Sequence, residues 1–203
     1  MLVKEKFYSF FFKKKYLFLI RLIIIYLFLT NITYAEIKGR LIEKIKNTDT
    51  LTFQFKQQIS NKIETGNCII KYPKLLKCDY DDKYEKRLIS NGKTVAIIQK
   101  RYNKIISIYP LKTTILYFIL DKEYLIKFIN NNKAMILDDF LVKYEIQEKN
   151  KKIIIFFDRN SLDLIGWETE DLYKNNVKLK FSDVKTNIPV KEKFFKIPSK
   201  NEL

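Results

Sequence analysis

The chain has 203 residues, with 39 lysines and arginines against 23 aspartates and glutamates, and a formal net charge of +16 at pH 7. It contains no histidine, which excludes Ser-His-Asp and Cys-His catalysis and removes the commonest metal ligand. The sequence also lacks metal-ligand spacing and nucleic-acid-binding motifs. We therefore expect a protein that is not an enzyme, binds no nucleic acid, and needs neither a metal nor a cofactor.

The first 35 residues have the pattern of an export signal. Lys13-Lys14-Lys15 form a basic segment, an apolar segment runs from Tyr16 to Leu29, and a cleavage site can follow Ala35. Arg21 interrupts the apolar segment, so an uncleaved membrane anchor is the alternative, although about 20 apolar residues are needed to span a bilayer. Both interpretations place the rest of the chain outside the cytoplasm.

We predict a signal peptide over residues 1–35 and one domain over residues 36–203, which are enough for a sizeable core but too few for two domains. The positive charge favours contact with anionic lipid headgroups or acidic protein surfaces. A composition biased towards lysine, isoleucine and asparagine explains the same charge without any partner, and both explanations stay open.

An amphipathic helix is predicted first, because Ile37, Leu41 and Ile45 repeat at four-residue spacing. From Leu51 the apolar period changes to two and continues to Ile59, which is typical of a half-buried strand. The sequence thus passes from a helix directly into a sheet.

Turn signals divide the following residues into an antiparallel meander. Gly66 opens a strand that Pro73 ends, because proline has no N–H for the ladder. Asn91-Gly92 is a strong hairpin signal, in which both central residues would adopt positive φ. The predicted strands cover residues 66–72, 75–80, 84–90, 93–100 and 104–109.

The two cysteines lie on either side of the turn at Pro73. A three-residue loop from Tyr72 to Lys74 would set Cys68 opposite Cys78, within disulfide range. A four-residue loop would instead place the thiols on opposite faces. In an oxidising compartment, the first register predicts a structural disulfide.

An apolar helix is predicted after Pro110, with Thr113-Thr114 as its cap. Its apolar residues are Ile115, Leu116, Phe118, Ile119 and Leu120. Such a helix must either be covered by the sheet or cover something itself. Strands are predicted to resume at residues 140–147, 153–157, 162–170 and 177–184.

Several short motifs carry a family resemblance. They are Phe53-x-Phe55-x-Gln57, Gly66, Ile70 to Leu75, Tyr80, Leu88 to Lys93, Phe157-Asp158, Leu164, Asp171 and Phe194 to Pro198. Their order resembles the LolA family of periplasmic outer-membrane lipoprotein carriers. The resemblance implies a mainly β (α+β) fold, an incomplete, strongly curved antiparallel β-barrel with helices covering its open mouth.

For function, the resemblance implies a monomeric periplasmic chaperone of a Gram-negative bacterium that holds lipoprotein acyl chains in a hydrophobic cavity. It would receive acylated lipoproteins from an inner-membrane ABC-type lipoprotein-releasing complex and deliver them to the outer membrane, with or without a receptor there. An open cleft beneath a movable lid, matched by the helix at 113–120, would suit such transfer. The expected lipid-binding residues are Ile70, Tyr72, Leu76, Tyr80, Leu88, Val95, Ile97, Leu116, Ile119 and Leu120, and ordinary core packing is the alternative for each.

One residue departs from the family pattern. Tyr72 stands where the family usually has an arginine, before the proline, that bonds to the lid. Tyrosine donates one hydrogen bond where a guanidinium has five donors, so a contact that holds the lid must be weaker or built differently. The main alternative function is a lipid- or protein-binding sensor on the same scaffold, similar to anti-sigma-factor regulators. A hydrolase with an unrecognised site is a third possibility.

Overall fold

The computed structural model describes residues 20–21, 36–136, 140–148, 151–171 and 174–199. The chain separates into one compact unit of residues 1–39 and a larger one of residues 40–203, and the following description concerns the larger unit. The predicted signal peptide lies outside the described residues except for Ile20 and Arg21. Within the described ranges, none of the helices has the length and apolarity that a membrane crossing requires.

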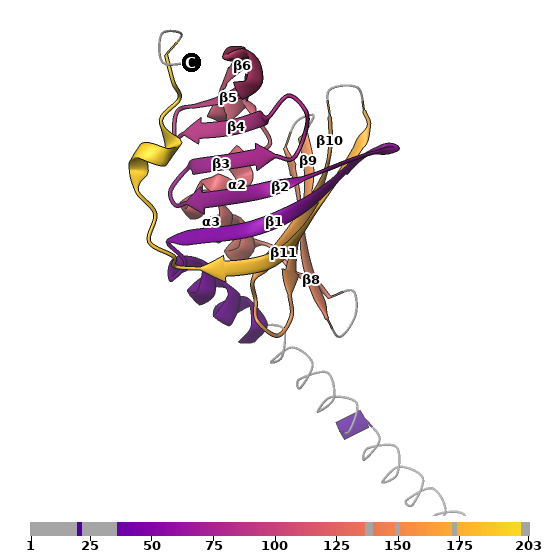
Figure 1. Ribbon diagram of the computed structural model, residues 1–203. Helices are drawn as coiled ribbons and strands as arrows, with labels where there is room; N and C mark the ends of the chain where they lie inside the picture. The colour runs from indigo at the N-terminus through magenta and orange to yellow at the C-terminus, as the bar shows by residue number, and fades with distance from the viewer. Residues whose placement is uncertain (1–19, 22–35, 137–139, 149–150, 172–173, 200–203) are drawn as a thin grey trace, which may run out of the picture. The chain divides into compact units, whose positions relative to one another are not determined.

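In the described part of the chain, eleven strands form one antiparallel sheet in the order β6-β5-β4-β3-β2-β1-β11-β10-β9-β8-β7 (Figure 1). β1 pairs with β11, so the sheet joins the first and last of these strands, and among the described residues β6 and β7 form its two free edges. The strands are β1 (Thr50–Ile59), β2 (Lys62–Lys71), β3 (Leu75–Tyr80), β4 (Lys86–Asn91), β5 (Thr94–Gln99), β6 (Lys104–Pro110), β7 (Met135–Ile136), β8 (Leu141–Glu148), β9 (Lys151–Asp158), β10 (Leu164–Glu170) and β11 (Asn176–Thr186).

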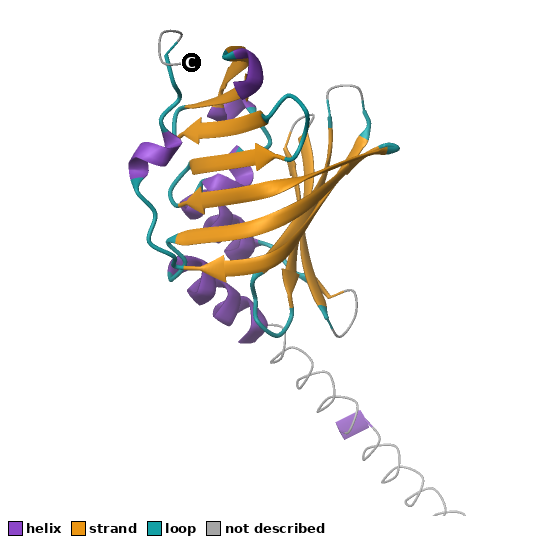
Figure 2. Ribbon diagram, in the orientation of Figure 1, coloured by secondary structure: helices purple, strands orange, loops and turns teal. Residues whose placement is uncertain are grey.

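Short helices interrupt or flank this sheet. They are a helix at 36–46, of which residues 40–46 belong to this unit, and η1 (Lys100–Tyr102), η2 (Leu111–Thr113), α2 (Tyr117–Leu120), α3 (Lys122–Asn131) and η3 (Glu192–Phe195). Figure 2 shows the sheet curving around α2 and α3, which lie on its concave side. The predicted mainly β fold, an incomplete antiparallel barrel with helices across its mouth, is confirmed.

Alternating burial follows from the period-two sequence pattern of the strands. On β1, Leu51, Phe53 and Phe55 are buried, while the residues between them are partly or fully exposed. β2 begins at Lys62, four residues before the predicted start at Gly66. A Cβ at Gly66 would lie 2.1 Å from a backbone oxygen of β3 and 2.8 Å from the Phe55 ring, so this position requires glycine.

The turn between β4 and β5 differs from the prediction. Only Gly92 adopts a positive φ, and Ser90 pairs with Val95, so the two-residue loop is Gly92-Lys93 rather than Asn91-Gly92. The side-chain carbonyl oxygen of Asn91 accepts hydrogen bonds from the backbone N–H groups of Lys93 and Thr94, at 3.0 and 2.9 Å. The asparagine therefore supports the turn with its side chain, as in an Asx-turn, and its own φ stays negative.

A second, smaller core lies on the opposite side of the sheet from the main one. Ile89, Ala96 and Ile98 form this cluster, with Ile105 and Ile197 packed against it. Ile197 belongs to the C-terminal segment, whose helix η3 contacts β3 and β4. The convex face at this end of the sheet is therefore covered by the chain itself.

Candidate functional site

The predicted lipid-binding residues of the sheet share its concave face. In the first row, Ile70 pairs with Leu76, Leu76 with Ser90, and Ser90 with Val95, so the four side chains point the same way from four neighbouring strands. All four are buried. The Ser90 hydroxyl donates to the Lys74 carbonyl oxygen at 2.7 Å, so the one polar group in the row has a partner.

A second row lies two residues further along the strands. Leu88 pairs with Cys78 on one side and with Ile97 on the other, and Tyr80 follows at the end of β3. Leu88, Ile97 and Tyr80 are only partly buried. The concave face thus changes from a closed apolar row to a partly open one.

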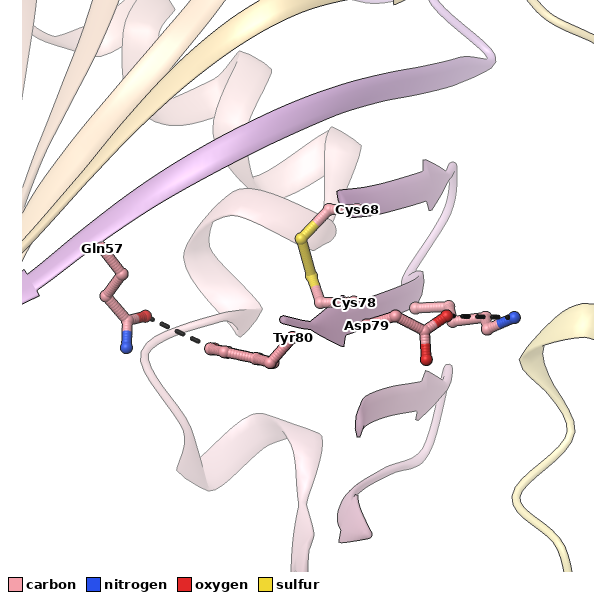
Figure 3. Close-up of a disulfide and its surroundings, with 6 residues drawn as sticks. Gln57, Cys68, Cys78, Asp79 and Tyr80 are labelled. Carbon is pink, nitrogen blue, oxygen red and sulfur yellow. Dashed lines mark hydrogen bonds and ion pairs between the residues drawn. A yellow bond between two sulfur atoms is a disulfide. The ribbon is translucent and has the colours of Figure 1, made fainter. Parts of the chain in front are cut away.

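The disulfide lies in this second row. Cys68 and Cys78 are directly opposed and bonded, with a Cα–Cα distance of 4.1 Å, in the register of a three-residue loop (Figure 3). Figure 3 also shows Tyr80 pointing towards Gln57 across the strands, where the Tyr80 hydroxyl and the Gln57 side-chain carbonyl oxygen are 3.4 Å apart. The disulfide fixes β2 to β3 across the middle of the concave face.

Residues 111–131, comprising η2, α2 and α3, form what we call the lid. The predicted helix over 113–120 is wrong in extent, because Thr114 is extended and α2 has a single turn. The Thr113 and Thr114 hydroxyls donate backwards to the carbonyl oxygens of Pro110 and Leu111, both at 2.8 Å, so they stabilise a turn instead of capping a helix.

Most of the lid's apolar side chains are buried on its inner side. Ile119 and Leu120 on α2 and Leu125 and Ile129 on α3 have essentially no exposed surface, whereas Leu116 before α2 is partly buried. The structure therefore brings the predicted residues of the lid and of the sheet together. It does so by packing, whereas the sequence predicted an open cleft.

Two contacts join the lid to the turn between β2 and β3. The Lys74 backbone N–H donates to the Leu120 carbonyl oxygen at 2.9 Å, and the Lys74 ammonium pairs with the Asp121 carboxylate at 3.1 Å. Asp121 also caps α3 by accepting from the Tyr124 backbone N–H at 3.1 Å. These contacts lie two residues after Tyr72, the position at which the family pattern has the arginine that bonds to the lid.

Asp121 stays ionised although its burial disfavours the charged form. Burial alone would raise the pKa of Asp121, but hydrogen bonds from the Tyr124 amide, the Tyr117 hydroxyl and Lys74 outweigh it and lower the pKa below its usual value. The Lys74 pKa is raised, chiefly by its hydrogen bond to Asp121. Both groups are therefore charged near neutral pH, and the ion pair stays intact.

Tyr72 lies beneath the lid but does not replace the family's arginine. Burial raises the pKa of its phenol, and within the described residues its hydroxyl has no hydrogen-bond partner. Its ring lies 5.6 Å from the Lys122 ammonium, and its backbone N–H donates to the Asp49 carbonyl oxygen at 2.9 Å. Lys122 in turn donates to the Lys46 carbonyl oxygen at 2.6 Å, which ties α3 to the helix at 36–46.

A small cavity adjoins Tyr72. Its volume is about 30 Å³, and its lining includes Ile45, Leu51, Leu125 and Phe157. A volume of this size corresponds to about one water molecule, whereas pockets for drug-sized ligands occupy at least roughly 300 Å³. This cavity is therefore too small to hold an acyl chain in the observed conformation.

A buried carboxylate that the sequence reasoning missed lies at the other end of the concave face. The Glu64 carboxylate is 2.6 Å from the Lys62 ammonium, 2.8 Å from the Lys86 ammonium, and 2.9 Å from the Gln57 amide nitrogen. Burial opposes its ionisation, but the Lys62 and Lys86 ammonium groups lower the Glu64 pKa overall. Strand alternation could have predicted that Glu64 is buried, because it lies an even number of residues from Cys68 and Ile70 on the same strand and therefore points to the same face.

The sequence model of the family described as outer membrane lipoprotein carrier protein LolA matches residues 46–198. No curated protein matches the sequence. Three solved structures illustrate the similarity. An uncharacterized conserved protein from Thermus thermophilus has a TM-score of 0.51 and 10% identity, covering 83% of this chain and 96% of that chain.

A LolA superfamily protein from Nitrosomonas europaea has a TM-score of 0.42 and 10% identity, covering 81% of this chain and 97% of that chain. The Pseudomonas aeruginosa MucA/MucB complex gives a TM-score of 0.44 and 9% identity, covering 83% of this chain and 62% of that chain. At such identities, the Thermus protein supports the fold alone. Because the family model spans more than half of the sequence, the chain belongs to the LolA family of outer-membrane lipoprotein carrier proteins.

Proposed function

We propose that this protein is a periplasmic carrier that binds the acyl chains of lipoproteins between the concave face of its sheet and its lid. In this proposal it takes lipoproteins at the inner membrane and delivers them to the outer membrane. The observation that carries the proposal is the apolar lid, which covers an apolar sheet face and is joined to the β2–β3 turn by the contacts of one residue, Lys74.

The energetics favour exchange of the lid for cargo. Transfer of a sixteen-carbon acyl chain from water to an apolar site is worth roughly 12 kcal/mol, at about 0.8 kcal/mol per methylene. Removing the lid exposes Ile119, Leu120, Leu125 and Ile129, and the incoming chain restores apolar contact on the sheet side. The free-energy cost of opening the lid in the presence of cargo is therefore much smaller than the cost of exposing the apolar surfaces of both the lid and the sheet to water.

Partly buried residues indicate where an acyl chain would first make contact. Tyr80, Leu88, Ile97 and Leu116 are the members of the predicted set, besides Tyr72, that are not fully buried. A chain that enters beside them would then meet the buried row of Ile70, Leu76 and Val95 as the lid moves away. With Ile119 and Leu120 of the lid, these residues make up the predicted set of ten, which remains our proposed lipid-binding surface.

Native cargo provides the test. The protein should be isolated gently from the cell envelope and analysed by intact mass spectrometry for bound lipoprotein or lipid. Ile97→Gln on the concave face should reduce the amount of cargo, whereas Ile105→Gln should not, because Ile105 packs against the convex cluster. Both residues are partly buried isoleucines, so the pair controls for the loss of an apolar side chain.

Release of lipoproteins from spheroplasts is the second measurement. A lipid-free protein that also fails to release lipoproteins would refute the carrier function. A stable complex with a membrane-anchored protein, formed without turnover of cargo, would instead support the sensor function. Hydrolysis of a lipid ester would indicate an enzyme, and both outcomes would overturn the proposal as stated.

A further inference from the structure

The free edge strand β6 and the turn before it expose several large apolar side chains. Tyr102 is 59% exposed, Ile106 46%, Ile108 52% and Tyr109 45%, all within eight residues of sequence. Single exposed apolar residues are ordinary, but a group on one edge is typical of an interaction surface. We call Arg101, Tyr102, Lys104, Ile106, Ile108 and Tyr109 the β6 edge patch.

The unpaired charges of this part of the chain have one sign. Residues 86–120 contain seven basic residues and no acidic residue. Three of the basic groups are paired with acids from elsewhere, namely Lys86 with Glu64, Arg87 with Asp79, and Lys100 with Glu85. Within the described residues, the other four form no ion pair; they are Lys93, Arg101, Lys104 and Lys112. These four cations favour a partner that carries negative charge.

The geometry of β6 disfavours a peptide strand as that partner. The register shifts between Ile97 and Ile98, which pair with Ser107 and Ile105, so Ile106 is an extra residue in a β-bulge. Pro110 at the end of the strand has no N–H to offer. Bulges and prolines are devices that prevent the addition of a strand to an edge. A partner without a fixed register fits this edge better.

A lipid bilayer is such a partner. Tyrosine rings and isoleucine side chains enter the boundary between headgroups and acyl chains, and lysine and arginine bind anionic phosphates above it. We propose that the β6 edge patch docks the protein onto the surface of an anionic phospholipid bilayer. The lid follows β6 directly, beginning with η2 at Leu111, so docking would bring the lid close to the membrane (Figure 1).

This inference goes beyond the proposed carrier function and does not depend on it. It can be tested with vesicles of phosphatidylcholine, with and without phosphatidylglycerol, that contain no acylated protein. If the protein did not bind vesicles, the proposed cargo binding would not be affected. If it did not bind cargo, the proposed vesicle binding would not be affected. Each variant is purified after export from the same kind of cell, so that residues 1–35 are processed in the same way in every variant. Any contribution of these residues to binding is then the same in each.

Sedimentation with vesicles measures the partition coefficient. The protein should bind vesicles with phosphatidylglycerol more tightly than neutral ones, and salt should weaken this preference. The double variant Arg101→Gln/Lys104→Gln should bind roughly 30-fold more weakly, because each basic residue near an anionic surface contributes about fivefold. Lys56→Gln/Lys180→Gln is the matched control, since these exposed lysines face each other on β1 and β11.

The control pair lies far from the patch. β1 is five strands from β6, which is roughly 24 Å at about 4.8 Å per strand. Equal losses in the two double variants would show that net charge alone drives binding and would overturn the proposal. Ile106→Ser/Ile108→Ser should lower binding by roughly tenfold through lost apolar burial. Equal binding to both kinds of vesicle, or capture of an extended acidic peptide without vesicle binding, would also overturn it.

Discussion

Replacement of Asp121 by asparagine should loosen the lid without unfolding the protein. Asparagine caps helices as well as aspartate does, so the bond from the Tyr124 backbone N–H to the side chain is kept. The change removes the charge that attracts the Lys74 ammonium across 3.1 Å, together with the second carboxylate oxygen, while the hydrogen bond that the Tyr117 hydroxyl makes to this side chain is also altered. Asp121→Asn therefore separates the ion pair from the cap.

The structure sets the size of the effect. The Asp121 side chain is 11% exposed and the Lys74 side chain 35%, so the pair lies between a surface pair and a buried one. Solvent screening at Lys74 reduces the expected loss to about 1 kcal/mol. If that energy favours the closed lid, the equilibrium constant for opening should rise about fivefold.

Hydrogen exchange measures this opening locally. Backbone amides of α3, such as the Leu125 N–H bonded to the Asp121 carbonyl oxygen at 3.0 Å, should exchange about fivefold faster in the variant. Amides of β1 should be unaffected. Glu170→Gln is a suitable control, because Glu170 pairs with Lys174 at the same 3.1 Å distance but at an exposed site.

Two results would contradict this reasoning. Unchanged exchange in α3 would mean that the ion pair does not hold the lid closed. Equal acceleration in α3 and β1 would mean that the substitution lowers global stability, and that the lid does not open as a separate unit.

Three further predictions concern stability. Reduction of the disulfide between Cys68 and Cys78 should lower the free energy of unfolding by about 2.5 kcal/mol, from the loop that it closes; an unchanged urea midpoint would argue against this. Because folding lowers the pKa of Glu64, its ionised carboxylate stabilises the folded state at pH values above the ordinary glutamate pKa. This stabilisation is lost as the pH falls through the lowered pKa of the folded state. Glu64→Gln should thus flatten the fall in stability below about pH 4, and an identical pH profile would exclude the contribution. Gly66→Ala should prevent folding or cost more than about 3 kcal/mol, because the new Cβ would overlap the backbone oxygen of Asp79; a thermal midpoint like that of the wild type would contradict the geometry.

The strands were predictable because one face of the sheet is buried. A buried face forces period-two alternation, which the sequence shows from Leu51 to Ile59 and again in the strands around Pro73. The pairing of Ile70 with Leu76 follows once the length of the turn is known. The predicted register and the concave set of residues rest on this local rule.

The lid was only partly predictable. Helix α3 went unrecognised, although Asp121 as a cap and Leu125 and Ile129 at four-residue spacing could have indicated it. The pairing of Lys74 with Asp121 joins residues far apart in sequence, and no local pattern specifies such a contact. The observed packing of the lid includes such long-range contacts, which local sequence patterns do not specify, and the sequence alone therefore predicted an open cleft.

The most direct test of the central claim locates a bound acyl chain on the protein. A lipopeptide with a photoreactive diazirine in its acyl chain can be cross-linked to the purified protein, and the modified residues mapped by mass spectrometry. We predict cross-links on the concave face and the lid, at Leu76, Leu88, Ile97 and Leu116. Cross-links confined to the convex cluster around Ile98, or none at all, would contradict the proposal that this face holds the cargo.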